Sequence, residues 1–579
     1  MKNRKAGSKK KPGNADGFSG RTGRKKIKTF LINAALAALA VLLFAGAFPN
    51  PLITYGFPFF AWIMYAPVFL LLTRVKLWAS PLWGAVYGFS AYSLFNYWLS
   101  SFHPLAGIIT CCFYSVFISA LFFFLRLAIV FFPRRFYIVQ WLIWITYEYT
   151  RTLGFLGYSY GITGYSQWQM IPLIQIAEIF GVWGVSALVL FPSAFLGAAL
   201  GKKGIFIQKP DAAERKIERG GLESIFTRIL RLRKKIIQPY SLMAWAAALI
   251  AVLAYGFAVS GGFDYAQTAN IALIQHNSEP WGGGIKDYRN DLTILKRLSD
   301  KALQEENKPD MVVWPETAFV PRIYWHETYR YDHASWLLVK DLLDYLAVQD
   351  VPFLIGNDDA RRDPSKNPNA NERYRVDYNA ALLYEKGKNT GLYRKMHLVP
   401  FVEYFPYKEL FPAFYQYLKE ENDLFWEIGT EFTVFSGPGF TFSAPICFED
   451  TFGYISREFV RNGAELIVNL SNDAWSKSLS AQNQHLAAAV FRAVENRRSV
   501  VRATVSGQTC GIDPTGKIIG MALPFTESYL TVAIPIAKGY TIYNQCGDFL
   551  AIGFSITAVL LLTISGGLYI IKNKGRRRI

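Results

Sequence analysis

The chain has 579 residues, of which 52% are hydrophobic and 16% aromatic, a composition too apolar for a protein that is soluble throughout. Its 62 Lys and Arg against 43 Asp and Glu give a net charge of +19, but much of this excess lies in tails and loops beside apolar stretches, where positive charge sets membrane topology, so we predict no nucleic-acid partner. The six histidines and five cysteines form no metal-binding motif, and the sequence predicts no cofactor.

Eight apolar stretches meet, some of them loosely, the requirement of ~20 residues for a helix that crosses ~30 Å of hydrocarbon. The fifth is the shortest and carries Glu148 near its end, but Arg135 and Arg151 flank it as basic residues flank a span. The sequence therefore predicts a membrane domain at residues 29–260 with seven spans, and an eighth span after a long polar block. The predicted spans lie near residues 29–48, 57–73, 78–99, 105–131, 136–150, 170–200, 241–260 and 548–571.

Lys and Arg in the short connections predict the orientation of these spans, because basic loops stay in the cytoplasm during insertion. The intervening connections, among them the Gly- and Tyr-rich GFLGYSYGITGYSQ, carry almost no positive charge. We therefore expect both termini in the cytoplasm and the polar block at residues 264–545 outside it. The basic segments share one side of this topology, at residues 1–28, 74–76, 134–135, 201–239 and 572–579.

The basic loop at residues 201–239 includes the run RILRLRKKI. Such a run is typical of a solvated cytoplasmic loop, and also of an amphipathic strip on anionic lipid headgroups. The sequence leaves both interpretations open.

The polar block has the composition of an ordinary globular domain. Short apolar runs predict strands, and longer mixed runs predict helices at residues 285–307 and 482–498. This mixture predicts a layered α/β sandwich with its reactive residues at strand ends. The predicted strands lie at residues 270–276, 310–314, 352–356, 379–385, 440–447 and 465–470.

Two motifs in this block carry charged groups out of apolar surroundings. In WPETA, Pro315 stops strand pairing and presents Glu316 at the end of a strand, where a carboxylate serves as a general base or forms a surface salt bridge. In YRKMHLVPFVEY, aromatic and apolar residues surround Lys395 and Glu403 in the sequence. A buried lysine beside a carboxylate stays charged and can stabilise an oxyanion, whereas an isolated lysine is more often solvated.

The third motif, SAPICFED, ends a predicted strand at Cys447. A lone cysteine at such a position usually serves packing, but a neighbouring base and cation turn it into a nucleophile, and the chain supplies both types in the same domain. A carboxylate, an ammonium and a thiol together predict acyl transfer. Because the chain also sits in lipid, we expect the acyl group to come from the bilayer. Elsewhere in the block, Cys510 and Cys546 either form a disulfide or remain free thiols.

WPET, YRKMHLVPFVEY and PICFED occur in this order and are followed by NLSNDAW and QHLAAAVFRAVENRRSVVRAT. These motifs resemble the nitrilase superfamily, whose hallmark is a Glu, Lys and Cys triad. With the extracytoplasmic block inserted between the last two of eight spans, residues 30–571 resemble the apolipoprotein N-acyltransferase family. The resemblance implies a nitrilase-like αββα sandwich in which Glu316 is the general base, Lys395 the oxyanion stabiliser and Cys447 the nucleophile.

The resemblance also implies supporting roles for Glu403 and Glu449 and a substrate-proximal role for Trp281, which lies in the loosely matching QHNSEPWGGG. Two positions depart from the family pattern. Phe448 stands where a tyrosine is common, and residues 504–507 read TVSG where a turn with Asn is usual. These departures affect fine tuning and leave the triad intact.

The implied reaction is ping-pong acyl transfer in a bacterial inner membrane, without a cofactor. A phospholipid, typically phosphatidylethanolamine, gives its sn-1 chain to Cys447 as a thioester. The α-amine of a diacylglyceryl-cysteine apolipoprotein then takes it, which completes lipoprotein maturation. Both substrates are membrane-anchored, so the site must open laterally toward lipid.

The aromatic segment at residues 403–426 is a candidate lid at the interface or an insertion packed on the domain. Two other functions compete with acyl transfer. A membrane-tethered amidase would share the triad but need no lipid portal, and a transporter or scaffold with a dead catalytic domain would need no triad.

Overall fold

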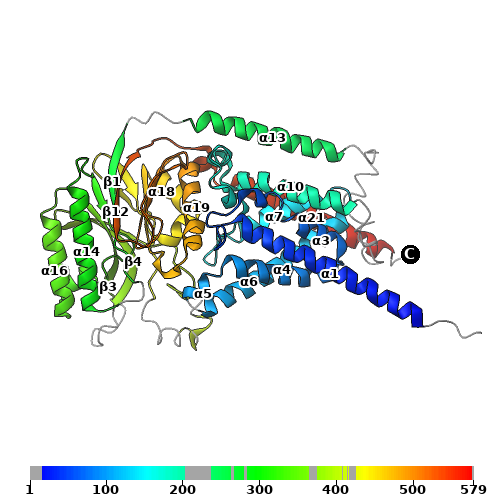
Figure 1. Ribbon diagram of the computed structural model, residues 1–579, viewed down its shortest axis with the longest axis horizontal. Helices are drawn as coiled ribbons and strands as arrows, with labels where there is room; N and C mark the ends of the chain where they lie inside the picture. The colour runs from blue at the N-terminus through cyan, green and yellow to red at the C-terminus, as the bar shows by residue number, and fades with distance from the viewer. Residues whose placement is uncertain are drawn as a thin grey trace, which may run out of the picture.

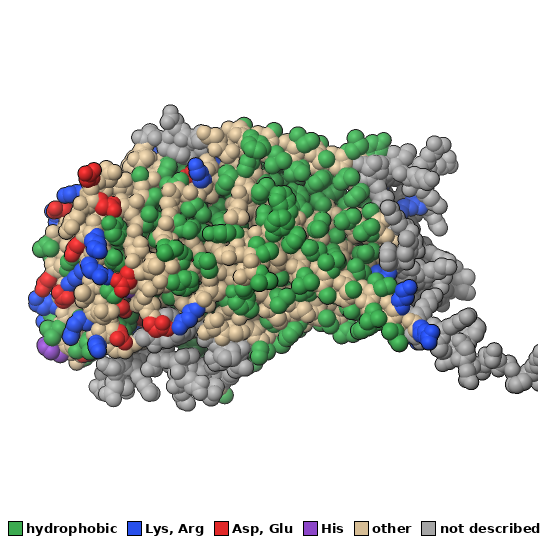
Figure 2. Space-filling view, viewed as in Figure 1, with side chains coloured by type: hydrophobic (Ala, Val, Ile, Leu, Met, Phe, Trp, Pro, Cys, Tyr) green, Lys and Arg blue, Asp and Glu red, His purple; other side chains and the backbone are tan. Residues whose placement is uncertain are grey.

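The computed structural model describes residues 16–102, 104–202, 237–261, 267–279, 283–363, 375–406, 409–413, 415 and 425–576. Apolar helices form one half of the molecule, and two β-sheets with flanking helices form the other half (Figure 1). Hydrophobic side chains cover the face of the helical half that Figure 2 shows, while Asp, Glu, Lys and Arg gather over the outer end of the sheet half. The two halves therefore present the surfaces expected for lipid and for water.

Five helices within the described residues are long and apolar enough to cross a membrane. Three shorter helices, α3 (Ala66–Arg74), α4 (Ser80–Phe95) and α7 (Phe136–Thr150), pack among them and fall within predicted spans. The structure thus supports five crossings, and the count of eight stays a prediction. The five long helices are α1 (Asp16–Ala47), α6 (Pro104–Phe131), α10 (Val182–Lys202), α13 (Ile237–Val259) and α21 (Phe549–Arg576).

The predicted span at residues 170–200 is wrong over its first third. There the chain forms the short helices α8 (Ile171–Ile174) and α9 (Ala177–Phe180) before α10 begins. Gly181 has φ +63°, a left-handed conformation that ends a right-handed helix and that glycine adopts without strain. The apolar run is therefore continuous in sequence but broken in the backbone.

Each sheet of the second half has six strands and contains both parallel and antiparallel pairs. The first has the order β12-β1-β2-β3-β4-β5 and the second β11-β10-β9-β8-β7-β6. The first sheet contains β1 (Thr268–Gln275), β2 (Met311–Val313), β3 (Phe353–Arg362), β4 (Arg375–Glu385), β5 (Lys388–Arg394) and β12 (Ser528–Pro535). The second contains β6 (Val434–Ser436), β7 (Thr441–Ser443), β8 (Leu466–Ser471), β9 (Ser499–Thr504), β10 (Cys510–Ile512) and β11 (Ile518–Met521).

Helices lie outside both sheets (Figure 1). On the outer side, α14 (Ile285–Leu303) buries leucines at helical spacing, Leu292, Leu295 and Leu298, and forms a core with α16 (His333–Ala347) and the first sheet. On the other side, α18 (Gly453–Arg461) and α19 (Leu479–Asn496) cover the second sheet. Shorter helices are α2 (Pro58–Ala61), α5 (Leu99–Phe102), α15 (Ile323–Tyr329) and α20 (Ile542–Cys546).

Helix α19 lies between the second sheet and the apolar helices, and its residues from Ser480 to Asn496 are all buried, polar ones included. Asn483 Nδ2 donates to the Thr54 carbonyl at 2.8 Å, and Gln484 Oε1 accepts from Trp98 Nε1 at 3.0 Å. One hydrophobic core runs through both the helical bundle and the second sheet. The half that contains the two sheets therefore rests on the helical half through a shared interior.

The predicted strand at residues 440–447 is too long. β7 ends at Ser443, and Cys447 begins a short 3₁₀ helix, η4 (Cys447–Thr451). Pro445 has no N–H to donate, and after Ser443 the pairing is reduced to one parallel bridge between Ile446 and Leu470, so the strand ends before Cys447. The strands β5, β6 and β9 to β12 were missing from the prediction.

Candidate active site

Glu316 lies in the turn directly after β2 and is 6% exposed. Its Oε1 accepts hydrogen bonds from Asn379 Nδ2 at 2.8 Å and from Lys395 Nζ at 3.2 Å, and its Oε2 accepts from the Asn472 N–H at 2.9 Å. These three donors come from separate segments and fix the carboxylate. The surface salt bridge considered for Glu316 is therefore excluded by its burial.

Lys395 follows β5 and is fully buried. Its Nζ donates to Glu316 and, at 2.8 Å, to Glu403 Oε1. Burial alone would lower the pKa of this ammonium, but the two carboxylates raise it well above its usual value. Lys395 is thus held as a cation between two acids. We name Glu316, Lys395 and Glu403 the front cluster.

Glu403 is placed by the loop that follows Lys395. Its Oε2 accepts from the Val399 N–H at 2.9 Å, which leaves Oε1 for the ammonium. Burial raises the pKa of Glu403, against the opposing effect of Lys395. The front cluster contains two carboxyl groups and one ammonium, so its acidic groups outnumber its basic group.

Cys447 has φ +50°, in the left-handed region that non-glycine residues rarely adopt. Its carbonyl oxygen accepts from His485 Nε2 at 3.2 Å and from Asn469 Nδ2 at 3.4 Å. Ile446, just before it, bridges Leu470 of β8. Strained backbone that several partners hold in place is typical of functional sites.

The Cys447 thiol interacts electrostatically with the front cluster. Burial raises the pKa of the thiol well above its usual value, Glu316 raises it further and Lys395 lowers it. The resting sulfur is therefore a protonated thiol. It needs a base to become a nucleophile, and Glu316 is the carboxylate with the largest effect on it.

Glu449 is fully buried two residues after Cys447, but it braces the loops and does not bond to the ammonium. Its oxygens accept from Tyr393 Oη and from the N–H groups of Ile446, Met396 and His397 at 2.7 to 3.0 Å. Burial raises the pKa of Glu449, and its backbone donors oppose this. The side chain therefore ties the loop after Lys395 to the turn of Cys447.

A loop of the membrane half, residues 152–162, reaches the same site. The Tyr160 ring stacks on Phe448, with centroids 6.2 Å apart, and the Phe155 ring lies 5.9 Å from His397 and 5.0 Å from Tyr404. Phe448 is the neighbour of Cys447 in sequence. The Gly- and Tyr-rich connection thus supplies one aromatic wall of the site.

Both ends of this loop are fixed at the membrane half. Glu148 accepts from the N–H of Thr163, at 3.1 Å, and from its hydroxyl, while Tyr158 N–H donates to the Arg151 carbonyl at 2.9 Å. Arg151 Nη1 donates to Tyr92 Oη at 2.8 Å. Glu148, which weakened the prediction of the fifth span, and Arg151, which flanks that span, therefore anchor the loop that carries Phe155 and Tyr160.

Behind Cys447 lies a second ionic group that sequence reasoning missed, which we name the rear cluster: Asp450, Asp473, His485 and Arg502. All four side chains are at most 6% exposed. They come from η4, the loop after β8, α19 and β9, so no local pattern links them. The signal available in the sequence was His485, a polar residue within the Ala-rich run of the predicted helix at residues 482–498.

Trp281 and the candidate lid fall largely outside the described residues, whereas the two cysteines lie within them. Trp281 lies outside the described residues, as does much of the segment 403–426, so its role as a lid stays a prediction. Cys510 is buried in β10 and Cys546 is exposed, and both are free thiols. No group of three or more His, Cys, Asp or Glu among the described residues is arranged to hold a metal ion.

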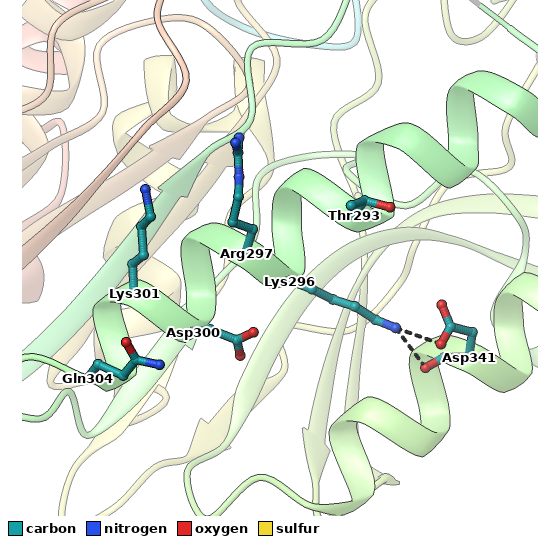
Figure 3. A pocket seen from close by; sticks show the side chains of 7 residues that line it. All are labelled: Thr293, Lys296, Arg297, Asp300, Lys301, Gln304 and Asp341. Atoms are coloured by element: carbon teal, nitrogen blue, oxygen red, sulfur yellow. Dashed lines mark hydrogen bonds and ion pairs between the residues drawn. The ribbon is translucent and has the colours of Figure 1, made fainter.

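A hollow of about 460 Å³ lies along α14, on the outer side of the first sheet (Figure 3). Lys296 on its wall pairs with Asp341 at 2.8 Å. None of the candidate catalytic residues lines it. The hollow is lined by Thr293, Lys296, Arg297, Asp300, Lys301, Gln304 and Asp341.

Comparison with known proteins covers both halves of the chain. The carbon-nitrogen hydrolase model matches residues 270–542, and the apolipoprotein N-acyltransferase N-terminal domain model matches residues 37–195. Apolipoprotein N-acyltransferase 1 of Treponema denticola is 44% identical over 96% of this chain and 99% of its own length, and that of Treponema pallidum is 45% identical over 94% and 96%. The apolipoprotein N-acyltransferase of Borreliella burgdorferi is 29% identical over 89% of this chain and 92% of its own length.

Proposed function

The chain belongs to the apolipoprotein N-acyltransferase family of the nitrilase superfamily, and from this premise we propose that Glu316, Lys395 and Cys447 carry out its acyl transfer. The enzyme adds a fatty acyl chain to the N-terminal amine of lipoproteins. The observation that carries the proposal is the front cluster, a buried ammonium between two carboxylates that acts on the Cys447 thiol. Acyl transfer needs a base, a nucleophile and an oxyanion partner, and these groups supply each one.

The first half-reaction forms the acyl-enzyme. Glu316 takes the thiol proton, and Cys447 Sγ attacks the carbonyl carbon of the sn-1 ester of a phospholipid. Lys395 stabilises the tetrahedral oxyanion. The ester C–O bond then breaks, the leaving oxygen takes the proton from Glu316, and a thioester and a lysophospholipid result.

The second half-reaction transfers the acyl chain. The free α-amine of a diacylglyceryl-cysteine attacks the thioester carbonyl carbon and loses a proton to Glu316. The C–S bond breaks, and the leaving thiolate takes that proton back, so the enzyme returns to its starting state. Glu403 keeps Lys395 charged and oriented through both half-reactions.

The arrangement in the membrane is part of the proposal. The five long helices, together with the apolar segment Pro58–Arg74 that contains α2 and α3, and with α4 and α7, make the eight crossings that place both termini in the cytoplasm and the αββα sandwich in the periplasm. Phosphatidylethanolamine is the proposed donor. Aromatic side chains from the membrane half at the site, Phe155 and Tyr160, suit chain-bearing substrates that enter sideways from the bilayer.

The test is intact-mass analysis of the purified protein with phosphatidylethanolamine vesicles. We expect a gain of one fatty acyl group that a diacylated lipopeptide discharges, and a Cys447→Ser variant without the gain. Cys112→Ser, which changes an exposed thiol in α6, is the matched control and should acylate normally. Full lipopeptide acylation by Cys447→Ser would overturn covalent catalysis through this sulfur.

The same experiment separates the competing functions. An amidase would release a free acid in place of the acylated lipopeptide. A scaffold with a dead catalytic half would show neither the adduct nor turnover.

A further inference from the structure

The rear cluster holds His485 between acceptors on both ring nitrogens. Nδ1 lies 2.9 Å from Asp473 Oδ1, and Nε2 lies 2.6 Å from Asp450 Oδ1 and 3.2 Å from the Cys447 carbonyl oxygen. Arg502 hydrogen-bonds to Asp450 and lies 3.4 Å from Asp473 Oδ2. The cluster is therefore a closed set of two acids, one guanidinium and one imidazole.

The hydrogen-bond geometry sets the charge of this imidazole. A carboxylate and a carbonyl oxygen only accept, so each ring nitrogen must carry a proton. The Arg502 guanidinium also lies 3.3 Å from Nδ1, a contact that favours a neutral ring, but the Asp473 oxygen is nearer. An imidazolium also balances the buried charge at zero, whereas a neutral ring would leave one unpaired negative charge.

The groups that face His485 from its neighbours agree with this charge. They are the acids Asp450 and Asp473, the guanidinium Arg502, the Cys447 carbonyl and, with ring centroids 6.1 Å apart, Tyr160. Burial alone lowers the pKa of His485, but the two acids raise it to about 9. The ring is then charged throughout the neutral range.

The position of this cation matters because its Nε2 proton is shared between Asp450 Oδ1, at 2.6 Å, and the carbonyl oxygen of the strained residue, at 3.2 Å. Cys447 has φ +50°, and its carbonyl is held by His485 and Asn469. A charged donor forms the stronger of these two bonds. We propose that His485 is a positioning residue, a buried imidazolium that holds the Cys447 backbone in its left-handed turn and so fixes the position of Sγ.

This inference rests on the proposed role of Cys447 as nucleophile, so its first test is independent of acyl transfer. The full-length protein in detergent is labelled with 15N-histidine, and its six histidines are assigned with the help of a His485→Gln variant. We expect both His485 ring nitrogens to be protonated at pH 7. An unprotonated ring nitrogen at pH 7 would overturn the proposal, and this measurement on the unaltered protein needs no folded variant.

The second test measures how fast the Cys447 thiol reacts. His485→Gln keeps a donor but loses the charge, His485→Leu loses both, and we expect Cys447 alkylation and acyl-enzyme formation to fall in that order, by about 10²-fold for Leu. The control is Asn483→Leu, which removes a hydrogen bond to a backbone carbonyl from the same helix, away from the site. It should leave both rates unchanged.

The outcomes distinguish this inference from the proposed function. Alkylation that slows in His485→Leu supports positioning even if no acyl-enzyme forms. Equal alkylation rates in the unaltered protein, His485→Gln and His485→Leu would show that the imidazolium does not position the sulfur.

Discussion

Two buried ionic clusters meet at Cys447, and they differ in charge balance. The front cluster has two carboxylates and one ammonium, whereas the rear cluster pairs two carboxylates with a guanidinium and an imidazolium. The front faces the thiol and the rear faces the carbonyl of the same residue. One cysteine is thus served by two kinds of electrostatic environment.

The difference in charge balance separates a cluster that takes part in the reaction from one that holds the cysteine in place. Uncompensated charge is costly to bury, so an excess carboxylate is retained where it can take up a proton during the reaction. A balanced cluster has no such capacity and instead fixes geometry. The comparison predicts that changes in the front cluster alter the reaction most, and that changes in the rear cluster alter how well the sulfur is presented.

The largest expected effect is that of Lys395→Met. It leaves two carboxylates buried without a cation, which should lower the free energy of unfolding by about 3–5 kcal/mol. Loss of the oxyanion partner should slow acyl-enzyme formation by about 10²–10³-fold. Thermal unfolding in detergent and intact-mass kinetics measure the two effects. Lys296→Met, which removes a partly exposed ion pair, is the control and should cost less than about 1 kcal/mol. A Lys395→Met protein as stable as the unaltered one would contradict the charge argument.

Glu403→Gln and Glu449→Gln compare two buried acids that differ in their partner. Only Glu403 bonds to the ammonium, so its loss should slow both half-reactions by about 10- to 100-fold, the equivalent of one charge-assisted hydrogen bond. Glu449→Gln disturbs backbone donors and should instead lower the free energy of unfolding by about 1–3 kcal/mol. Single-turnover rates of acylation and the free energy of thermal unfolding distinguish the two variants. The reverse pattern would show that Glu449, and not Glu403, supports the reaction.

The stability of the rear cluster should depend on pH through His485. Its pKa is raised from 6.5 to about 9 in the folded protein, so the stabilisation is fully present below about pH 6.5 and is lost as pH rises through about 9. We expect the free energy of unfolding to fall between pH 7 and pH 10, and to fall less in His485→Gln. Denaturant titrations at several pH values measure this. Identical slopes for both proteins would count against a charged His485.

The smallest expected effect concerns the aromatic wall. Phe155→Ala removes ring contacts with His397 and Tyr404, each worth about 0.5–1.5 kcal/mol. We expect KM for a lipopeptide to rise by up to about tenfold with kcat nearly unchanged. Tyr158→Phe, which only removes a hydroxyl bonded to Asn96, is the matched control on the same loop. A fall in kcat alone would assign Phe155 to the chemistry and not to substrate binding.

Local patterns in the sequence predicted the features that depend on neighbouring residues, such as long apolar helices and the turns that end strands. Apolar runs located the long helices, and the WPETA motif placed Glu316 in the turn after β2, where it bonds to Lys395. The break at Gly181 was not predictable from hydropathy, because the apolar composition continues through it. Cys447 in a left-handed turn was missed for a similar reason, since a strand pattern does not report the φ of its last residue.

The rear cluster could not be predicted because its four members lie in four separate segments. Each one alone reads as a surface charge or a satisfied core histidine. Only the packing of α19 between the second sheet and the membrane half brings His485 to Asp450 and Asp473. The sequence shows the candidates, and the topology decides which of them meet.

The interior shared by α19, the second sheet and the apolar helices limits how this enzyme can be re-engineered. A chimera that exchanges only the soluble half with that of a distant relative would place foreign side chains against Thr54 and Trp98. Such a graft should assemble only if α19 is exchanged together with its partners, the segment 49–54, Trp98 and the aromatic loop 152–162. The sheet half of this architecture therefore cannot be exchanged alone.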